Sequence, residues 1–186
     1  MEKITYKITL QVLTPFSICF GAGKEEGISN KIIRNNSGYP YIPASTIKGL
    51  VRYYYSYLFE KGHIESANGL CRCNVCKIFG SQGNMPSRIF FEDLNFEKDD
   101  SLGTPVVSTK ASIAIDRYRR AVRNKALFTQ EMVENGIFSG RIILYLDSDE
   151  IHLKKQIEMA IKMIDRIGSS KSRGLGSVKV LLKEVK

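Results

Sequence analysis

The chain has 186 residues, enough for one large domain whose core needs no disulfide bonds. Lys and Arg number 28 against 19 Asp and Glu, a formal charge of +9 that favours a polyanionic partner. A basic protein without such a partner is the alternative. No apolar run could span a bilayer and no charged-then-apolar leader opens the chain, so we expect a cytoplasmic protein with no membrane partner.

Four segments alternate apolar and polar residues like strands, and two repeat apolar residues at helical spacing. The strands are expected at 3–13, 87–96, 136–146 and 177–185. One helix follows Pro43 and ends near Phe59, and the other is capped by Asp147, Ser148 or Asp149. This order predicts an α+β fold with a ferredoxin-like βαββαβ core, which RNA-recognition domains also use. Two long inserts, 14–42 and 97–136, interrupt it, and such inserts are usually functional.

The start of the first helix carries two cations on one face. Lys48 and Arg52 are four residues apart, and Ser45 or Thr46 is expected to cap the helix. Cations near a helix N-terminus, whose dipole already favours anions, make a plausible phosphate site. Gly49 between them is unfavourable in mid-helix, which indicates that a packed strand or a ligand approaches the backbone there.

A cysteine cluster follows the first helix. Three cysteines fall within six positions and a histidine lies eight positions upstream: His63, Cys71, Cys73 and Cys76. Three thiolates and one imidazole match a closed, structural Zn²⁺ site. Reduced surface thiols without metal are the alternative, and His152 is a rival fourth ligand. The fourth cysteine, Cys19, is expected to be a small buried apolar residue.

A glycine-rich loop occupies residues 168–176 and carries Lys171, Ser172 and Arg173. Glycine lets backbone N–H groups approach phosphate, although Leu175 and Gly176 follow Gly174 where a Walker A loop has Lys and Ser or Thr. A simple helix cap and turn is the alternative. Because a cap needs one glycine and this loop has three, we favour nucleic-acid contact.

The second long insert contains the most basic segment. Four arginines surround Tyr118 there: Arg117, Arg119, Arg120 and Arg123. A solvated charged face is the ordinary explanation. Guanidinium groups interleaved with an aromatic ring suit single-stranded nucleic acid better, through phosphate contacts and base stacking. No catalytic set stands out, because histidine is scarce and the paired carboxylates fall in loops.

Four motifs in order resemble the Cas7-type proteins of the RAMP superfamily, the backbone subunits of type III and related (type VII-like) CRISPR effector complexes. They cover nearly the whole chain: residues 39–52, Cys71-x-Cys73-x₂-Cys76-Lys-Ile-Phe-Gly80, Asp116-Arg117 with Leu127-Phe128-x₂-Glu131, and residues 168–176. The resemblance implies one domain over residues 1–186, with a zinc-binding insertion at about 60–80 and a protruding thumb at about 97–136.

The resemblance further implies that copies of the chain stack along a guide RNA (crRNA) and present it for pairing with target RNA, with the thumbs kinking the duplex. Lys48, Gly49, Arg52 and the glycine-rich loop would hold the guide. Other effector subunits, Cas5-like and including a separate nuclease, would be partners. RNA rather than DNA as the target follows from the resemblance alone.

One departure from the family bears on catalysis. Active, Csm3-like members carry an Asp within a run like Ile-Asp-Asn-Pro-Val-Ile-Arg, and here the matching run Ile28–Arg34 has Ser29 in its place. A hydroxyl cannot replace a carboxylate in metal-assisted phosphodiester cleavage, so we expect no catalytic residue. The alternatives are a target-RNA endoribonuclease using Glu25 or Glu26, a guide-processing endonuclease of the Cas6 kind, and a stand-alone RNA-recognition-like domain.

Overall fold

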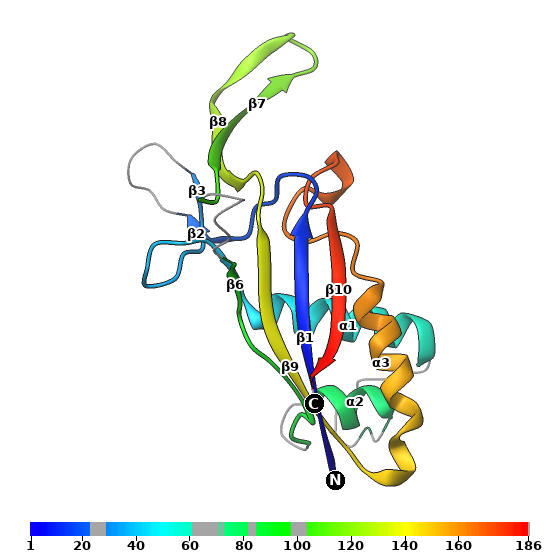
Figure 1. Cartoon of the computed structure of the whole chain (residues 1–186). Helices are drawn as coiled ribbons and strands as arrows, with labels where there is room; N and C mark the ends of the chain where they lie inside the picture. Colours follow the sequence, from blue (N-terminus) through cyan, green and yellow to red (C-terminus); the bar gives the residue numbers. More distant parts are fainter. Residues whose placement is uncertain (23–28, 61–70, 72, 82–84, 98–103, 186) are drawn as a thin grey trace.

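The structure is a computed structural model that describes residues 1–22, 29–60, 71, 73–81, 85–97 and 104–185, with the backbone alone at 20–22 and 125. Those residues form a six-stranded sheet, a four-stranded sheet and helices (Figure 1). The expected α+β class is therefore confirmed. Among the described residues, no helix is both long and apolar enough to cross a membrane.

The six-stranded sheet and the helices on one of its faces form a unit that we call the palm. Its strand order is β10-β1-β9-β6-β4, β5 also pairs with β9, and neighbours are antiparallel. The strands are β1 (Glu2–Val12), β4 (Tyr41–Ile42), β5 (Ile89–Phe91), β6 (Leu94–Phe96), β9 (Ile137–Leu146) and β10 (Val178–Val185). The helices α1 (Ala44–Phe59) and α3 (His152–Lys162) lie on the same face of the sheet (Figure 1).

The palm core forms where the alternating strand faces meet the helices. The residues of β1 that the alternation placed on one face are all buried: Ile4, Tyr6, Ile8, Leu10 and Val12. The helices complete the core with Ile47, Val51, Tyr55, Leu153, Ile157, Ala160 and Ile161, and Ile164 adds to it just after α3. Buried tyrosine hydroxyls keep partners, because Tyr6 Oη donates to Glu158 Oε1 at 2.9 Å and Tyr55 Oη to Gln156 Oε1 at 2.8 Å.

The expected strand over residues 87–96 is instead two short strands, β5 and β6, and the break between them determines how α1 begins. An added Cβ on Gly140 would lie 3.0 Å from Asp93 O, so glycine allows this close crossing. Asp93 Oδ1 then accepts a hydrogen bond from Ala44 N at 2.7 Å. The prediction that Ser45 or Thr46 caps α1 was wrong, because the N-cap is Pro43 and both residues lie in the first turn.

The two sequence inserts meet in the four-stranded sheet, whose order is β2-β3-β8-β7. β2 (Cys19–Ala22) and β3 (Asn30–Ile32) come from the first insert, and β7 (Val107–Asp116) and β8 (Ala121–Val133) from the second. We call the β7–β8 hairpin the thumb, and it projects away from the palm (Figure 1). The register of the hairpin shifts between Ile113 and Ile115, and both of its faces carry exposed residues, so its sequence lacks a clear period.

Three shorter helical segments complete the described chain: α2 (Asn74–Phe79), and the 3₁₀ turns η1 (Ser148–Glu150) and η2 (Lys171–Arg173). Asp147 was expected to cap the second helix. It instead caps η1, in a reciprocal pair with Glu150, and α3 begins after Ile151 without a side-chain cap. Asp147 is therefore a helix cap, as predicted, but it caps the short turn η1, and α3 begins separately after it.

Candidate nucleic-acid interface

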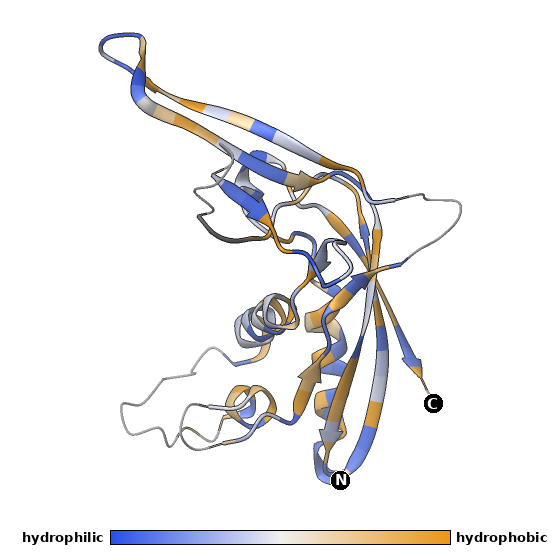
Figure 2. Cartoon of the chain, turned by 90° about the vertical axis from the view of Figure 1, so that its left-hand side faces the viewer, coloured by the Kyte–Doolittle hydropathy of each residue, from blue (hydrophilic) through white to orange (hydrophobic). Residues whose placement is uncertain are grey.

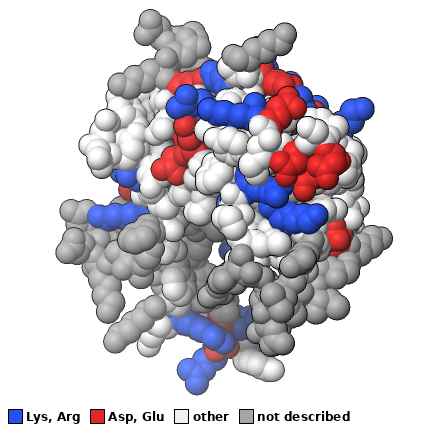
Figure 3. All heavy atoms as spheres, turned by 90° about the horizontal axis from the view of Figure 1, so that it is seen from below, with Lys and Arg blue, Asp and Glu red and all other residues white. Residues whose placement is uncertain are grey.

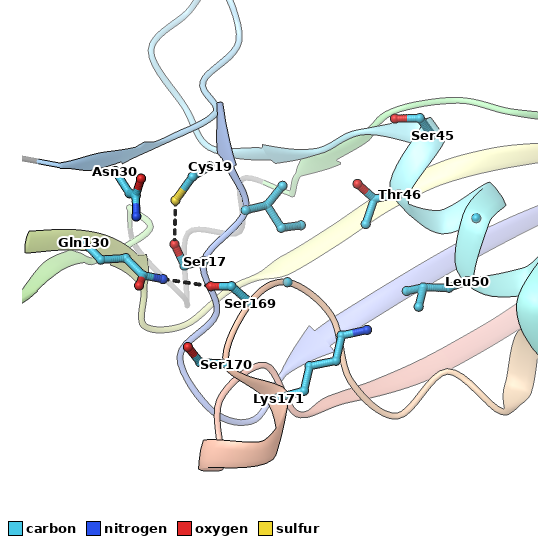
Figure 4. A pocket seen from close by; sticks show the side chains of 13 residues that line it. Ser17, Cys19, Asn30, Ser45, Thr46, Leu50, Gln130, Ser169, Ser170 and Lys171 are labelled. Atoms are coloured by element: carbon cyan, nitrogen blue, oxygen red, sulfur yellow. Dashed lines mark hydrogen bonds between the residues drawn. The ribbon is translucent and has the colours of Figure 1, made fainter. Parts of the chain in front are cut away.

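A pocket of about 880 Å³ opens where the start of α1, the glycine-rich loop and the base of the thumb converge (Figure 4). α1 contributes Ser45, Thr46 and Gly49, the loop contributes Ser169, Ser170 and Lys171, and the second sheet contributes Cys19, Asn30 and Gln130. Two of the sequence-predicted binding segments therefore share one cavity, although they are more than a hundred residues apart in the chain.

The α1 side of the pocket is open at Gly49. This glycine is exposed, and no atom of the described residues lies within 4 Å of the Cβ that a larger residue would carry there. The alternative that a packed strand explains Gly49 was therefore wrong, which leaves space for a ligand against the helix.

Beside Gly49, Lys48 is partly buried and its Nζ donates to Ser87 Oγ at 2.9 Å. Burial lowers the pKa of Lys48 below its ordinary value, and the positive charge of Arg52 lowers it further. Lys48 and Arg52 are like charges held close together, and their described hydrogen-bond partners include no carboxylate. Such a pair favours an incoming anion.

The three glycines of the loop all have positive φ angles: Gly168 at 74°, Gly174 at 86° and Gly176 at 78°. Two of them are also required by packing, since an added Cβ would lie 2.5 Å from Ser17 O at Gly168 and 1.9 Å from Ile167 O at Gly176. The three glycines therefore do not exceed what the turn needs, and the inference from their number to a ligand was wrong. The loop's conformation accounts for them without a ligand.

What the loop offers to a ligand is its exposed polar tip. Lys171 lines the pocket and points toward the side formed by α1 (Figure 4). Ser172 and Arg173, in the same 3₁₀ turn, are exposed and do not line the pocket. The guanidinium of Arg166 donates to Lys171 O and thereby fixes the turn.

The base of the thumb is tied to the loop and to the first insert. Gln130 Nε2 donates to Ser169 Oγ at 2.9 Å (Figure 4). Glu131 accepts from Ile32 N at 3.0 Å and pairs with Arg34 at 3.4 Å. These contacts join three of the segments around the pocket, namely the base of the thumb, the glycine-rich loop and the first insert.

Sequence reasoning missed the polar residues on the floor of this pocket. Ser17 is buried, and its Oγ donates to Glu131 O at 2.7 Å and lies 3.0 Å from Cys19 Sγ (Figure 4). The expectation that Cys19 is a buried apolar residue was wrong, since it is only partly buried and lines the pocket. No local signal marked either residue, because the pairing of distant strands brings them here.

Ser29 lies at the edge of the same region and is held against β8. Its N–H donates to Thr129 O at 3.0 Å and to Thr129 Oγ1 at 2.9 Å. Thr129 N donates back to Ser29 Oγ at 3.3 Å. The hydroxyl thus accepts a hydrogen bond from the backbone. Glu25 and Glu26, the suggested substitutes for a catalytic Asp, lie outside the described residues.

The basic segment forms the tip of the thumb, away from the pocket-lining residues. Arg117, Arg119 and Arg120 occupy the exposed turn between β7 and β8, and Arg123 is exposed on β8. Asp116 Oδ1 accepts from Tyr118 N at 2.9 Å and from Arg119 N at 3.1 Å, so the turn has a defined shape. Tyr118 is 99% exposed.

Charge is distributed differently at the far end of the palm. Acidic and basic side chains are interspersed there (Figure 3). Several form ion pairs, among them Arg88 with Asp147 at 3.1 Å and Lys154 with Glu184 at 2.8 Å. Such pairing leaves that end less suited to a polyanion than the thumb tip.

The cysteine cluster lies at the start of α2. The sulfur atoms of Cys71, Cys73 and Cys76 all lie within 4.8 Å of one another. Tetrahedral zinc–sulfur bonds of roughly 2.3 Å place ligand sulfurs roughly 3.8 Å apart, so the three thiols fit a zinc ion. His152 is not part of this group, which removes the rival ligand, and His63 lies outside the described residues.

The thiols of the cluster differ in their surroundings. Cys73 is the N-cap of α2, and its Sγ accepts from Cys76 N at 3.5 Å. Burial raises the pKa of Cys76 above its ordinary value, whereas a hydrogen bond from the backbone of Cys73 lowers the pKa of Cys71. Bound zinc would supply a rigid cross-link between these residues.

The sequence model of the RAMP superfamily matches residues 9–179, so the chain belongs to that superfamily. The chain is 28% identical over 170 residues to the "CRISPR system Cms endoribonuclease Csm3" of Methanocaldococcus jannaschii, covering 82% of this chain and 67% of that protein.

Its structure is similar to a chain of the type III-B Cmr-beta complex bound to cognate target RNA. The TM-score is 0.73 with 15% identity over 96% of both chains, a likeness of fold alone. The predicted resemblance to Cas7-type members of the superfamily is confirmed.

Proposed function

We propose that the chain is a non-catalytic, guide-RNA-binding backbone subunit of a type III or related CRISPR effector complex. The observation that carries this proposal is the shared pocket, where Gly49 of α1, Lys171 of the loop and Gln130 of the thumb base converge. The hydroxyls and amides of the pocket can donate to phosphate and ribose oxygens, and Lys171, with Lys48 and Arg52 nearby on α1, can offset phosphate charge.

The rest of the fold supports the same proposal. The strand order β10-β1-β9-β5/β6, with α1 and α3 on one face, is what a ferredoxin-like core requires. In this proposal copies of the chain assemble along the guide, with thumbs reaching the guide–target duplex. A Cas5-like subunit and a separate nuclease complete a cytoplasmic ribonucleoprotein that binds target RNA.

The proposal is tested by removing the two cations of α1, Lys48 and Arg52, which flank the pocket-lining residues in the sequence of the helix but do not line the pocket themselves. Lys48→Ala with Arg52→Ala should weaken guide-RNA affinity at least about a hundredfold, since two charge-assisted contacts are each worth about 1.5–3 kcal/mol. The matched control is Lys179→Ala with Lys183→Ala, which removes the same charge from exposed positions of β10. RNA affinity measured by filter binding, with unfolding followed in parallel, decides. Equal affinity of the two double variants would contradict the proposal.

Active cleavage of target RNA is the second candidate, favoured by the similarity to a protein named an endoribonuclease. We propose that Ser29 abolishes this activity, because its hydroxyl accepts from Thr129 N and supplies no carboxylate for a metal ion. The assembled complex, without added nuclease, should leave guide-complementary labelled RNA intact in Mg²⁺. Regularly spaced cuts would contradict a non-catalytic role.

Ser29→Asp restores the missing carboxylate, and Ser29→Asn is its matched uncharged control. Cuts produced by the Asp variant alone would assign the loss of activity to residue 29. Cuts by both variants would implicate other groups.

We also propose that Cys71, Cys73 and Cys76 hold a structural Zn²⁺ with His63 as the fourth ligand. The sulfur separations support three of these ligands. Cys71→Ser and Cys76→Ser should each lose bound zinc, measured by elemental analysis, whereas Cys19→Ser should keep it. His63→Ala tests the fourth ligand with His152→Ala as its control, and undiminished zinc in His63→Ala would exclude the proposed fourth ligand.

A further inference from the structure

Two tyrosines on α1 are exposed although their neighbours are not. Tyr53 is 63% and Tyr57 66% exposed. By contrast, Tyr54 Oη donates to Asp165 Oδ1 at 3.1 Å, and Tyr55 lies in the core. Helical aromatics usually pack inward, so burial in the core of the palm does not explain this exposed pair.

The exposed pair continues the wall of the pocket. Ser45 and Gly49 line the pocket, and Tyr53 and Tyr57 follow at successive four-residue steps, so all four are neighbours along one side of α1. From Ser45 to Tyr57 the row extends roughly 18 Å, at about 1.5 Å per residue. A chain that leaves the pocket along this side of the helix meets the two rings in turn.

The charge along α1 suits an anionic chain. Residues 44–59 contain Lys48 and Arg52 but no Asp or Glu. The rings of Tyr53 and Tyr57 are nearly parallel, with an interplanar angle of 13° and centroids 6.4 Å apart. Exposed, parallel aromatic rings on a helix that also carries cations offer a surface on which unpaired bases can stack while their phosphates are held. A protein partner is less favoured, because the cations would remain near an apolar contact.

We propose that Tyr53 and Tyr57 stack bases of the single-stranded RNA that leaves the pocket, which extends the binding site along α1. This inference rests on the proposed function, because it assumes that RNA occupies the pocket. It adds two residues that contribute by base stacking. Base stacking tolerates any RNA sequence, and it depends less on salt concentration than phosphate contacts do.

The first test replaces both rings. Tyr53→Ala with Tyr57→Ala should weaken the binding of a long oligoadenylate by about tenfold or more, since each stacked base is worth about 1–3 kcal/mol. A short oligoadenylate that only fills the pocket should bind the two proteins equally. Tyr53→Phe with Tyr57→Phe keeps the rings and should retain wild-type affinity for both lengths.

A spectroscopic test locates the contact. The chain has no tryptophan, so Tyr57→Trp introduces the sole indole. Stacking on a base should quench its fluorescence with the long oligoadenylate and leave it unchanged with the short one. Emission that does not respond, together with unchanged affinity of the alanine pair for the long RNA, would overturn the inference.

The remaining outcomes are also decisive. If the alanine pair changes the mass of the RNA-free protein, the tyrosines form a contact between copies and the inference fails. If neither RNA binds the wild-type chain, the proposed function is wrong and so is the inference that rests on it. If both RNAs bind and Lys48→Ala with Arg52→Ala abolishes binding, the proposed function stands whatever the tyrosines do.

Discussion

The palm and the thumb are built from strands of similar length that use their side chains in opposite ways. β1 in the palm has 11 residues and buries every second side chain from Ile4 to Val12. β8 in the thumb has 13 residues, and the buried ones among those described are Met132 and Val133 at its base. The hydropathy colouring shows apolar residues continuing into the projecting hairpin (Figure 2).

This contrast indicates that the palm is specified by its own core and the thumb by what it contacts. Ile113 and Leu127 face each other across the hairpin and are 52% and 61% exposed. A two-stranded ribbon gains little stability in water by itself. Such a hairpin keeps exposed apolar residues at a cost to solubility, which is consistent with a surface that is covered in a larger assembly.

The largest expected difference between the two regions is in the cost of truncating an isoleucine. Ile142→Ala, in the palm core, should lower the free energy of unfolding by about 2–5 kcal/mol because it leaves a cavity. Ile113→Ala, in the thumb, should change it by no more than about 0.5 kcal/mol. Urea unfolding of both variants measures the difference. Equal losses would mean that the thumb also has a buried face.

The next effect concerns the loop that joins α3 to β10. Gly176→Ala should cost about 2–3 kcal/mol, because a left-handed conformation costs an L-residue about 1–2 kcal/mol and the added Cβ must displace Ile167 O. Gly174→Ala has a similar φ but open space around it, so only the conformational cost applies. Thermal unfolding of the two variants separates packing from conformation. Equal shifts would show that Gly176 is not packed as described.

The palm could be predicted from the sequence because its signals are local. The alternation of β1 and β9 and the helical spacing of Ile157, Ala160 and Ile161 each reflect burial against one core, and the burial observed matches. Gly49 and Lys171 were also found, because a mid-helix glycine and a basic glycine-rich loop are unusual wherever they occur.

The rest of the site depends on contacts that no local pattern records. Ser17, Cys19, Asn30 and Gln130 are ordinary polar residues in the sequence, and they meet because β3 pairs with β8 in parallel at Asn30 and Gln130. The thumb was predicted, but the bounds and faces of its strands were not, for a related reason. Without a core there is no alternation of burial, so their period cannot be read from the sequence.

The arginines at the tip of the thumb should contribute to RNA binding and not to stability. Arg117→Ala, Arg119→Ala and Arg123→Ala combined should weaken RNA binding by about 10- to 100-fold and make its dependence on salt shallower, by about 0.7 in log–log slope for each lost phosphate contact. The free energy of unfolding should not change, because these side chains are exposed. Lys155→Ala, Lys162→Ala and Lys179→Ala combined remove the same charge from the palm. An equal loss of affinity in that control would show that only net charge matters.

The smallest effect compares two aspartates that accept hydrogen bonds from backbone N–H groups. Asp93 receives Ala44 N across 49 positions of the chain, whereas Asp116 receives Tyr118 N within the turn at the thumb tip. Asp93→Ala should cost about 1 kcal/mol, as the loss of a helix cap does, and Asp93→Asn should recover most of it. Asp116→Ala should leave global unfolding unchanged, because the tip can rearrange without disturbing the palm. Chemical denaturation measures both, and a larger loss for Asp116→Ala would mean that the thumb tip and the palm unfold as one unit.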